Sequence, residues 1–558
     1  DEVPRCIPLK LKAQAVILLL LYPLQTDKDV ETYSMPMPST RLRRSLIRAG
    51  LVATCLATAC FIRVSLALST PTSSSSSSSQ RKFVILGGTG KIGTAVAAHL
   101  WRRCPGCEIV LVGRRPAVGD EAIQQVRDIV ARDRFTTASS TASDYEYGDN
   151  EPPILSYRYI PDVWDPQCLR RFFADPAMAS TSCVIHTAGP YSERSPTVLD
   201  AVIAAQVHVY VDVSDPVPFL EASLERHPMA VATNTTALVA AGAFPGMSNV
   251  LAMEAAETAV GGNDDDTVHV KDVRFNYFTK GLGGSGTINL EITNSGFGDP
   301  IFQHDHGERK AFTDLSGTLL GDVDFFIQED DDTFGRLQGS RKWDNEQAKI
   351  RVGTRKVFSW PFPEAATVAT ELSISGSSCA AMGTAPDLWN DMLGLLVNVV
   401  PRGWWRSKSF SKFMADFSQP LVLLTDAWMQ WSAPEGDCGE THAMRIDVTT
   451  EQQREQQAKI TGMVSIVQAH DSFRQCVGQS CAEFALDLLE EPQAISGGVF
   501  LPEQRYRDAK DRRRIIDKLT STPGTFCYTG PVEIKSGSEE QRLPVYPSKV
   551  REILLSGK

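Results

Sequence analysis

A glycine-rich segment near residue 90 has the spacing of a phosphate-binding loop. It follows the GxGxxG pattern, with the residues Gly88, Thr89, Gly90, Lys91, Ile92 and Gly93. In such a loop the first glycine permits a tight turn and the second lets backbone N–H groups approach a pyrophosphate. The third lets the following helix pack closely. The apolar run 83–86 predicts a buried strand before the loop, and 94–100 predicts a helix after it. This order of strand, loop and helix indicates a dinucleotide site.

Two arginines follow the next expected strand, residues 108–112. NAD-binding units usually carry an acidic residue there, which accepts hydrogen bonds from the ribose 2′-hydroxyl. This chain has Arg114 and Arg115 instead, and guanidinium groups suit a 2′-phosphate. The pair therefore favours NADP(H), with NAD as the alternative. Surface arginines at the start of a helix are the other interpretation.

The ends of two later strands supply further candidate contacts. Asp162 follows the expected strand 155–160, where a carboxylate can meet the adenine amino group. The expected strand 183–185 leads into a turn that should lie beside the nicotinamide half of the cofactor. We expect that turn to bind through Ala188, Gly189 and Pro190.

Hydride chemistry also needs a group that manages one proton. The catalytic candidates are His186, Tyr210 and Asp212, all near carboxyl ends of expected strands. A histidine titrates in the useful range, although one that follows a buried strand is as often a packed residue. The sequence contains no Ser-His-Asp elbow, no HExxH motif and no Walker loop, which argues against hydrolase and kinase readings.

Other motifs predict structure and not chemistry. Residues 104–107 form a CxxC without a second pair at zinc spacing, so we expect a Pro-Gly turn and no metal site. The glycines of 281–286 also fit GxGxxG, but no helix and strand follow, so we expect a bend there. Alternating strand and helix patterns after residue 81 predict an α/β fold with a doubly wound parallel sheet.

The net charge bears on possible binding partners, and the composition of the N-terminal residues bears on localisation. A net charge of −11 provides no basic stripe for nucleic acid. Residues 1–80 resemble a targeting segment, because basic residues precede the apolar run 49–62 and a serine-rich, acid-free stretch follows. This order predicts a signal and transit peptide for import into a plastid. The alternatives are the secretory pathway or a retained membrane anchor.

Several segments resemble the saccharopine dehydrogenase-like, NADP-binding family, in particular its plant and algal plastid branch. They are GGTGKIGTAVA, VIHTAGPY, YVDVSD, GAFPGMSNVLAMEAAE, FNYFTKGLGGSGT, MGTAPDLWN, SGGVFLPEQ and GTFCYTG. The resemblance implies a Rossmann domain over 81–245 and an inserted α+β domain over 246–490 of substrate-binding or dimerisation type. It further implies a return to the Rossmann domain over 491–530 and a tail over 531–558.

The resemblance also implies an activity. Family members of known activity reduce or oxidise a C–N bond with a nicotinamide, so we expect a small-molecule substrate with a C–N or C=O bond. The alternative is a non-catalytic or membrane-associated NADP-binding protein. The apolar stretch 388–400 is followed by Trp404 and Trp405 among basic residues, a pattern that suits a membrane or lipid surface. The oligomeric state stays open, with a homodimer as one alternative.

Overall fold

The computed structural model describes residues 81–137, 152–261, 268–281, 287–328, 342–432, 440–454, 457–490 and 497–534. These residues all belong to one compact unit, Ser78–Lys558. The expected targeting segment, the last five residues of the second glycine pattern (282–286) and the tail beyond residue 534 lie outside the described residues. Among the described helices, none is long and apolar enough to cross a membrane.

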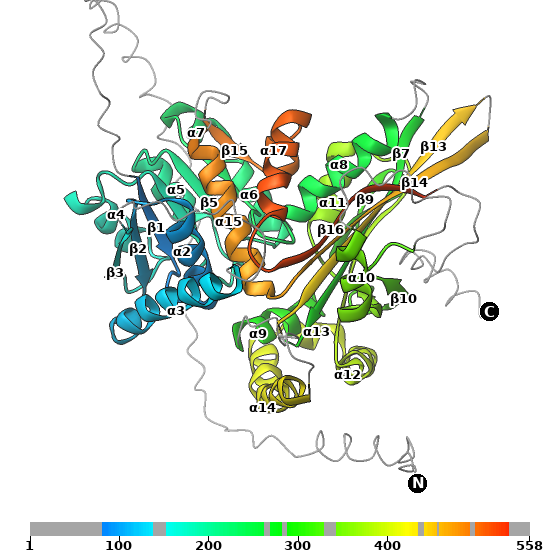
Figure 1. Cartoon of the computed structure of the whole chain (residues 1–558), viewed down its shortest axis with the longest axis horizontal. Helices are drawn as coiled ribbons and strands as arrows, with labels where there is room; N and C mark the ends of the chain where they lie inside the picture. The colour runs from blue at the N-terminus through cyan, green and yellow to red at the C-terminus, as the bar shows by residue number, and fades with distance from the viewer. Residues whose placement is uncertain are drawn as a thin grey trace, which may run out of the picture. The chain divides into compact units, whose positions relative to one another are not determined.

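The first sheet of the described residues contains seven parallel strands (Figure 1). They are β1 (Lys82–Leu86), β2 (Glu108–Gly113), β3 (Ile154–Tyr159), β4 (Cys183–His186), β5 (Val209–Asp212), β6 (Thr236–Leu238) and β15 (Gly498–Phe500). Their spatial order is β15-β6-β5-β4-β1-β2-β3, and every pairing is parallel. The order reverses between β1 and β4, which is the switch point where open α/β sheets bind ligands. The predicted doubly wound parallel sheet is confirmed.

Helices cover both faces of this sheet, because its strands are apolar on both sides. One face packs against α2 (Lys91–Arg103), α3 (Gly119–Thr137) and α15 (Phe473–Glu490). The other packs against α4 (Pro166–Phe173), α5 (Thr197–Ala204), α6 (Val217–Leu224) and α7 (His227–Thr233). Two short 3₁₀ turns, Pro116–Val118 and Pro176–Met178, complete this part. Helices α2 and α15 approach so closely that a Cβ on Gly478 would lie 2.7 Å from the Ala95 Cβ.

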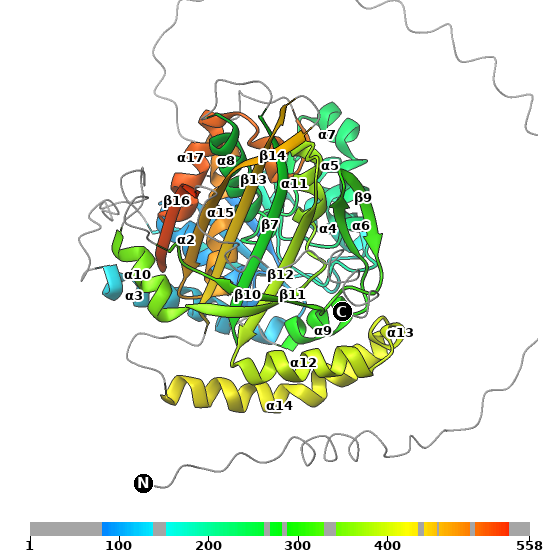
Figure 2. The ribbon, with the colours of Figure 1, turned by 90° about the vertical axis from the view of Figure 1, so that its right-hand side faces the viewer.

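A second sheet of seven strands among the described residues is mixed (Figure 2). In spatial order its strands are β10 (Leu319–Asp324), β11 (Thr354–Ser359), β12 (Ser378–Ala385), β7 (Val268–Lys280), β13 (His442–Arg454), β14 (Gln457–His470) and β16 (Thr525–Ile534). The β12–β7 pair is parallel and the other pairs are antiparallel. The α/β class is thus confirmed, with an α+β part built on this mixed sheet within the same compact body; this part is called the second unit below.

The remaining elements surround the second sheet. Helices α8 (Met247–Gly261) and α11 (Glu364–Leu372) pack on the face that shares one hydrophobic cluster with α2 and α15. Helix α10 (Lys342–Arg351) packs on the opposite face. The others are α9 (Thr287–Gly296), β8 (Ile301–Asp305), β9 (Glu308–Phe312), α12 (Asp387–Val399), α13 (Arg402–Trp405), α14 (Lys408–Ser432), α16 (Pro502–Arg505) and α17 (Ala509–Thr520).

The C-terminal segment divides between the two sheets. Strand β15 pairs with β6 in the first sheet, whereas β16 pairs with β14 in the second sheet and extends to Ile534. The chain was expected to return to the Rossmann domain over residues 491–530. Strand β15 does so, but residues 525–530 belong to β16 and lie in the second sheet. The physical reason is that β14 has a free edge, and β16 supplies the hydrogen-bond partners for it.

Candidate cofactor and active site

The glycine loop after β1 leaves no room for a side chain at positions 88 and 93. A Cβ on Gly88 would lie 2.8 Å from the Ile85 carbonyl oxygen and 2.9 Å from the Leu111 Cα. A Cβ on Gly93 would lie 2.4 Å from the Gly87 carbonyl oxygen. Contacts this short with backbone atoms are not sterically allowed. The chain therefore uses glycine to bring helix α2 directly against the turn that ends β1.

The loop presents the start of α2 as an anion site. Gly90 is the residue before the helix, is exposed, and offers no side chain to cap it. The first N–H groups of a helix lack intrahelical acceptors, and the helix dipole adds positive charge there. A pyrophosphate bound at this end would satisfy both. Lys91 is exposed at the same end, while Ile92 and Thr89 are half-buried.

The two predicted arginines begin beside this loop. A Cβ on Gly113, the last residue of β2, would lie 2.7 Å from the Thr89 Oγ1, so the strand end contacts the loop. Arg114 and Arg115 follow at once and are exposed. They therefore lie at the position where an adenosine 2′-phosphate would be recognised.

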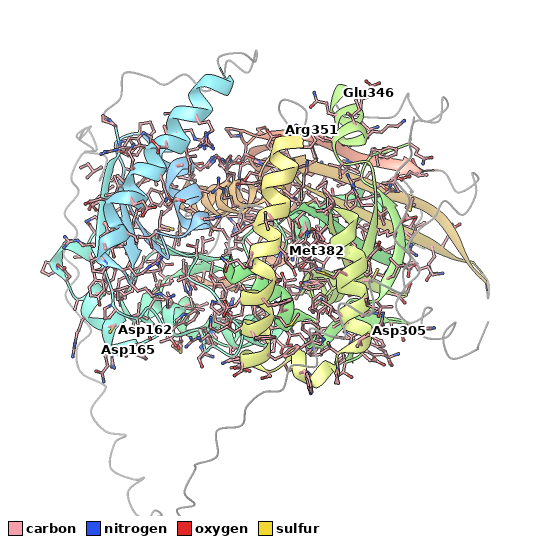
Figure 3. All side chains as sticks on the ribbon, turned by 90° about the horizontal axis from the view of Figure 1, so that it is seen from below. Asp162, Asp165, Asp305, Glu346, Arg351 and Met382 are labelled. Carbon is pink, nitrogen blue, oxygen red and sulfur yellow. The ribbon has the colours of Figure 1, made fainter. Side chains whose placement is uncertain are left out.

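Asp162 follows the neighbouring strand β3. Its Oδ1 accepts a hydrogen bond of 2.8 Å from the Trp164 backbone N–H, and Asp165 caps helix α4. The Asp165 Oδ1 likewise accepts from the Gln167 backbone N–H at 2.9 Å, so both carboxylates, labelled in Figure 3, take part in local turns. The contact of Asp162 with adenine stays a prediction.

The turn after β4 lies against the glycine loop, as the two strands are neighbours. A Cβ on Gly87 would lie 2.8 Å from the Ala188 backbone nitrogen. Ala188, Gly189 and Pro190 are half-buried in this turn. The structure thus brings the two predicted halves of the cofactor site together at the switch point of the sheet.

The three predicted catalytic residues form one buried chain of hydrogen bonds. The Tyr210 hydroxyl donates to the Asp212 Oδ2 at 3.0 Å and lies 3.1 Å from the His186 Nδ1. Asp212 also accepts from the Ser214 N–H, the Ser214 hydroxyl and the Ala240 N–H. All three predicted residues are fully buried. The chain ties the ends of β4, β5 and β6 together.

His186 was a candidate because a histidine ordinarily titrates near neutral pH, and its burial removes that property. Burial lowers the pKa of His186 to about 3, so the ring is neutral at physiological pH. Burial also raises the pKa of Asp212 and raises that of Tyr210 well above its ordinary value. The sequence shows residue type and strand position, but it does not show that all three side chains point into the core.

Asp215 is a further titratable residue at this edge, and it is not among the three predicted candidates. It lies three residues beyond β5, at the carboxyl edge of the sheet, and is half-buried. Burial, with the charges of Asp299 and Asp212, raises the pKa of Asp215 to about 6. A carboxyl with that pKa exchanges a proton near neutrality, as general acid–base catalysis requires.

Asp299 contributes to this shift through its charge. It follows helix α9, and burial together with the charge of Glu193 raises the pKa of Asp299 to about 6, against the lowering effect of Arg406. The charge of Asp299 acts on Asp215, which indicates that the end of β5 and the segment after α9 lie close together. The carboxyl edge of the parallel sheet thus meets the second unit at two carboxyl groups.

Two buried glutamates extend this acidic group. Glu364 begins α11, is fully buried and accepts a short hydrogen bond from the Tyr277 hydroxyl. Burial, with the charges of Glu503 and Asp215, raises the pKa of Glu364 to about 7. Glu503 accepts from the Asn249 amide at 2.8 Å, and burial raises its pKa as well.

One signal in the sequence could have identified Asp215. It is the last residue of the YVDVSD segment, three positions beyond the end of β5. Asp299 and Glu364 carry no such signal, because each stands alone after a helix or before one. Their proximity to Asp215 arises only when three distant segments fold together.

No protein-family model matches the chain, and no curated protein matches it. An engineered D-amino acid dehydrogenase bound to NADP+ is 12% identical, with 76% of this chain and 93% of that chain covered and a TM-score of 0.31. A mutant meso-dapdh from Clostridium tetani E88, with DAP, is 10% identical, with 76% and 94% covered and a TM-score of 0.33.

A ketoreductase domain from the bacillaene assembly line is 16% identical, with a TM-score of 0.21. The alignment covers 29% of this chain and 43% of the ketoreductase chain, so the chain spans less than half of that relative's length. Similarities at these TM-scores carry no argument about substrate or activity.

Proposed function

We propose that this chain is an NADP(H)-dependent oxidoreductase of the saccharopine dehydrogenase-like family, acting on a C–N or C=O bond of a small metabolite. The observation that carries the proposal is the glycine loop, where a Cβ on Gly88 or Gly93 would clash with backbone atoms. Such a loop at the start of a helix, at the switch point of a parallel sheet, suits a dinucleotide pyrophosphate.

The charges around the loop support NADP(H) over NAD. Arg114 and Arg115 are exposed directly after β2, where a carboxylate would select NAD. Two guanidinium groups can donate several hydrogen bonds to a 2′-phosphate. The family resemblance, which rests on the motifs quoted above, agrees with this preference.

The acidic group at the carboxyl edge supports a reaction that moves one proton. The nicotinamide supplies or accepts the hydride when NADP(H) is bound. We assign the proton to the Asp215 carboxyl, which gives it up in reduction and takes it back in oxidation. Asp299 helps to keep that carboxyl protonated near pH 6, because a second negative charge nearby disfavours ionisation.

Cofactor binding is tested by adding one methyl group to the loop. In Gly93→Ala the new Cβ would clash with the Gly87 carbonyl, so helix α2 must shift away from the turn. Overpacking of this kind costs about 1–3 kcal/mol, and we expect NADPH to bind roughly 10- to 100-fold more weakly. Isothermal titration calorimetry measures this change.

Gly261→Ala is the matched control, because a Cβ there meets no atom within 4 Å. It should bind NADPH like the parent. Circular dichroism of both variants distinguishes a lost site from a lost fold. Unchanged NADPH affinity in a folded Gly93→Ala variant would show that the loop does not hold the cofactor.

A further inference from the structure

Helices α12, α13 and α14 carry large apolar side chains that face outward. Figures 1 and 2 show these helices grouped at one margin of the second sheet. Trp404 is 58% exposed, Phe413 59% and Leu424 68%. The α12–α14 face consists of Leu395, Val399, Trp404, Phe413, Phe417, Leu421, Leu423 and Leu424.

The outward orientation follows from helix geometry. Phe413, Phe417, Leu421 and Leu424 are spaced by four, four and three residues, so they form one stripe along α14. The Phe413 and Phe417 rings stack with centroids 6.3 Å apart.

The other side of α14 is already packed. Met414 joins a cluster with Trp405 and Phe297, and Ala415 and Val422 pack with Leu290. The helix therefore has a buried apolar side and a second, exposed apolar side. Contiguous exposed apolar surface of this kind marks an interaction site.

Positive charge is concentrated at one end of this face. Between residues 392 and 415 the chain has no Asp or Glu, although its net charge is −11. The Lys408 and Lys412 side chains are 75% and 65% exposed, in surface pairs with Glu193 and Asp416. Arg402 and Arg406 complete the basic end, where both donate to backbone carbonyls.

These features select one kind of partner. Exposed Trp and Phe beside Lys suit the boundary between lipid headgroups and acyl chains, and the lysines suit anionic phosphates. Charge complementarity thus favours an anionic lipid surface.

We propose that the α12–α14 face docks the protein on an anionic lipid bilayer, with Trp404, Phe413 and Phe417 inserted at the headgroup boundary. Lys408 and Lys412 bind lipid phosphates in exchange for their surface pairs. The Lys408–Glu193 pair joins this face to the loop after β4. The α12–α14 face therefore adjoins the loop after β4, although docking does not depend on the proposed oxidoreductase activity.

The test is vesicle co-sedimentation of the full-length chain, with phosphatidylcholine vesicles with or without phosphatidylglycerol. The apolar variant is Trp404→Ser, Phe413→Ser and Phe417→Ser combined. We expect its partition coefficient on anionic vesicles to fall about tenfold or more. Met229→Ser with Val231→Ser, which removes exposed apolar side chains from α7, is the matched control and should bind like the parent.

A second pair of variants tests the charge. Lys408→Glu with Lys412→Glu should abolish the preference for anionic vesicles. Arg127→Glu with Arg132→Glu changes the same net charge on exposed positions of α3 and should leave the preference intact. Because the N-terminal residues are common to all variants, differences between variants report on the α12–α14 face alone.

The fluorescence of Trp404 gives an independent readout. Brominated lipids should quench the parent more than Trp404→Phe. Equal vesicle binding of the apolar variant and the parent would overturn the proposal. Conversion of a dimer to a monomer by the same substitutions, with vesicle binding unchanged, would instead assign the face to self-association. NADPH affinity and circular dichroism of the variants establish that they are folded.

Discussion

Replacing Arg114 and Arg115 together by alanine should remove the preference for NADPH over NADH. Each charge-assisted hydrogen bond to a phosphate is worth about 1.5–3 kcal/mol. Because both arginines are exposed, solvent screening favours the low end. Two such contacts at about 1.5 kcal/mol each correspond to roughly a hundredfold weaker NADPH binding. NADH affinity should hardly change, because NADH has no 2′-phosphate.

Equilibrium titration of both cofactors, at fixed ionic strength, measures this selectivity. The control is Arg127→Ala with Arg132→Ala, which removes the same charge from the exposed surface of α3. That variant should keep the parental ratio of affinities. If the unmodified protein binds NADH and NADPH equally, the two arginines do not read a 2′-phosphate.

Replacing Asp215 by asparagine should abolish most of the turnover and leave cofactor binding intact. General acid–base groups contribute about 10²–10⁴-fold to a rate, so kcat should fall by a factor in that range. An amide has nearly the volume of the carboxyl but carries no proton to transfer. NADPH affinity should stay within about threefold of the parent, a difference of less than 1 kcal/mol.

The role of Asp215 as proton carrier predicts how the rates of reduction and oxidation change with pH. The pKa of Asp215 is raised to about 6, so the carboxyl is protonated below that pH and ionised above it. Reduction needs the proton, and its rate should therefore fall as the pH rises through about 6. Oxidation needs the ionised form, and its rate should rise over the same interval. In Asp215→Asn both profiles should lose this transition.

Asp128→Asn is the control. Asp128 is exposed on α3, and its carboxylate accepts a hydrogen bond from the Gln124 side-chain amide. It should keep the parental rate and pH profile. A turnover number of Asp215→Asn within threefold of the parent would assign the proton to another group. Glu364, whose pKa is raised to about 7, is the next candidate.

The dinucleotide-binding part of the fold could be predicted because its signals are local. The glycine loop, the apolar strands and the small-residue helix each occupy a few consecutive residues. Strand β3 is expected at 155–160 and observed at Ile154–Tyr159, and β4 is expected at 183–185 and observed at Cys183–His186. Buried parallel strands are continuous apolar runs, and such runs need no tertiary information to be found.

The division of the C-terminal segment could not be predicted in the same way. Strand β15 has three residues and pairs with β6, which lies about 260 positions earlier in the chain. Strand β16 pairs with β14 at the edge of the other sheet. Which open edge a strand joins depends on the edges that the rest of the chain leaves exposed.

The candidate site shows the same contrast. The cofactor loop follows from spacing, whereas the proton carrier depends on burial. His186, Tyr210 and Asp212 have suitable chemistry, but their side chains all point into the core. Asp215, three positions beyond Asp212, becomes half-buried and approaches Asp299 only through the packing of the second unit. A carboxyl pKa near neutrality is a property of that packing, and the residue type alone does not encode it.

The most direct test of the account is NADPH-dependent turnover by the full-length protein. NADPH oxidation is followed by the loss of absorbance of the reduced nicotinamide ring. Three substrate classes are offered: 2-oxo acids together with amines, aldehydes, and preformed imines. The account predicts saturable oxidation with at least one of these classes, which Asp215→Asn removes and Asp128→Asn retains. NADPH binding without turnover in any of the three classes would contradict it and would leave the chain a cofactor-binding protein without this chemistry.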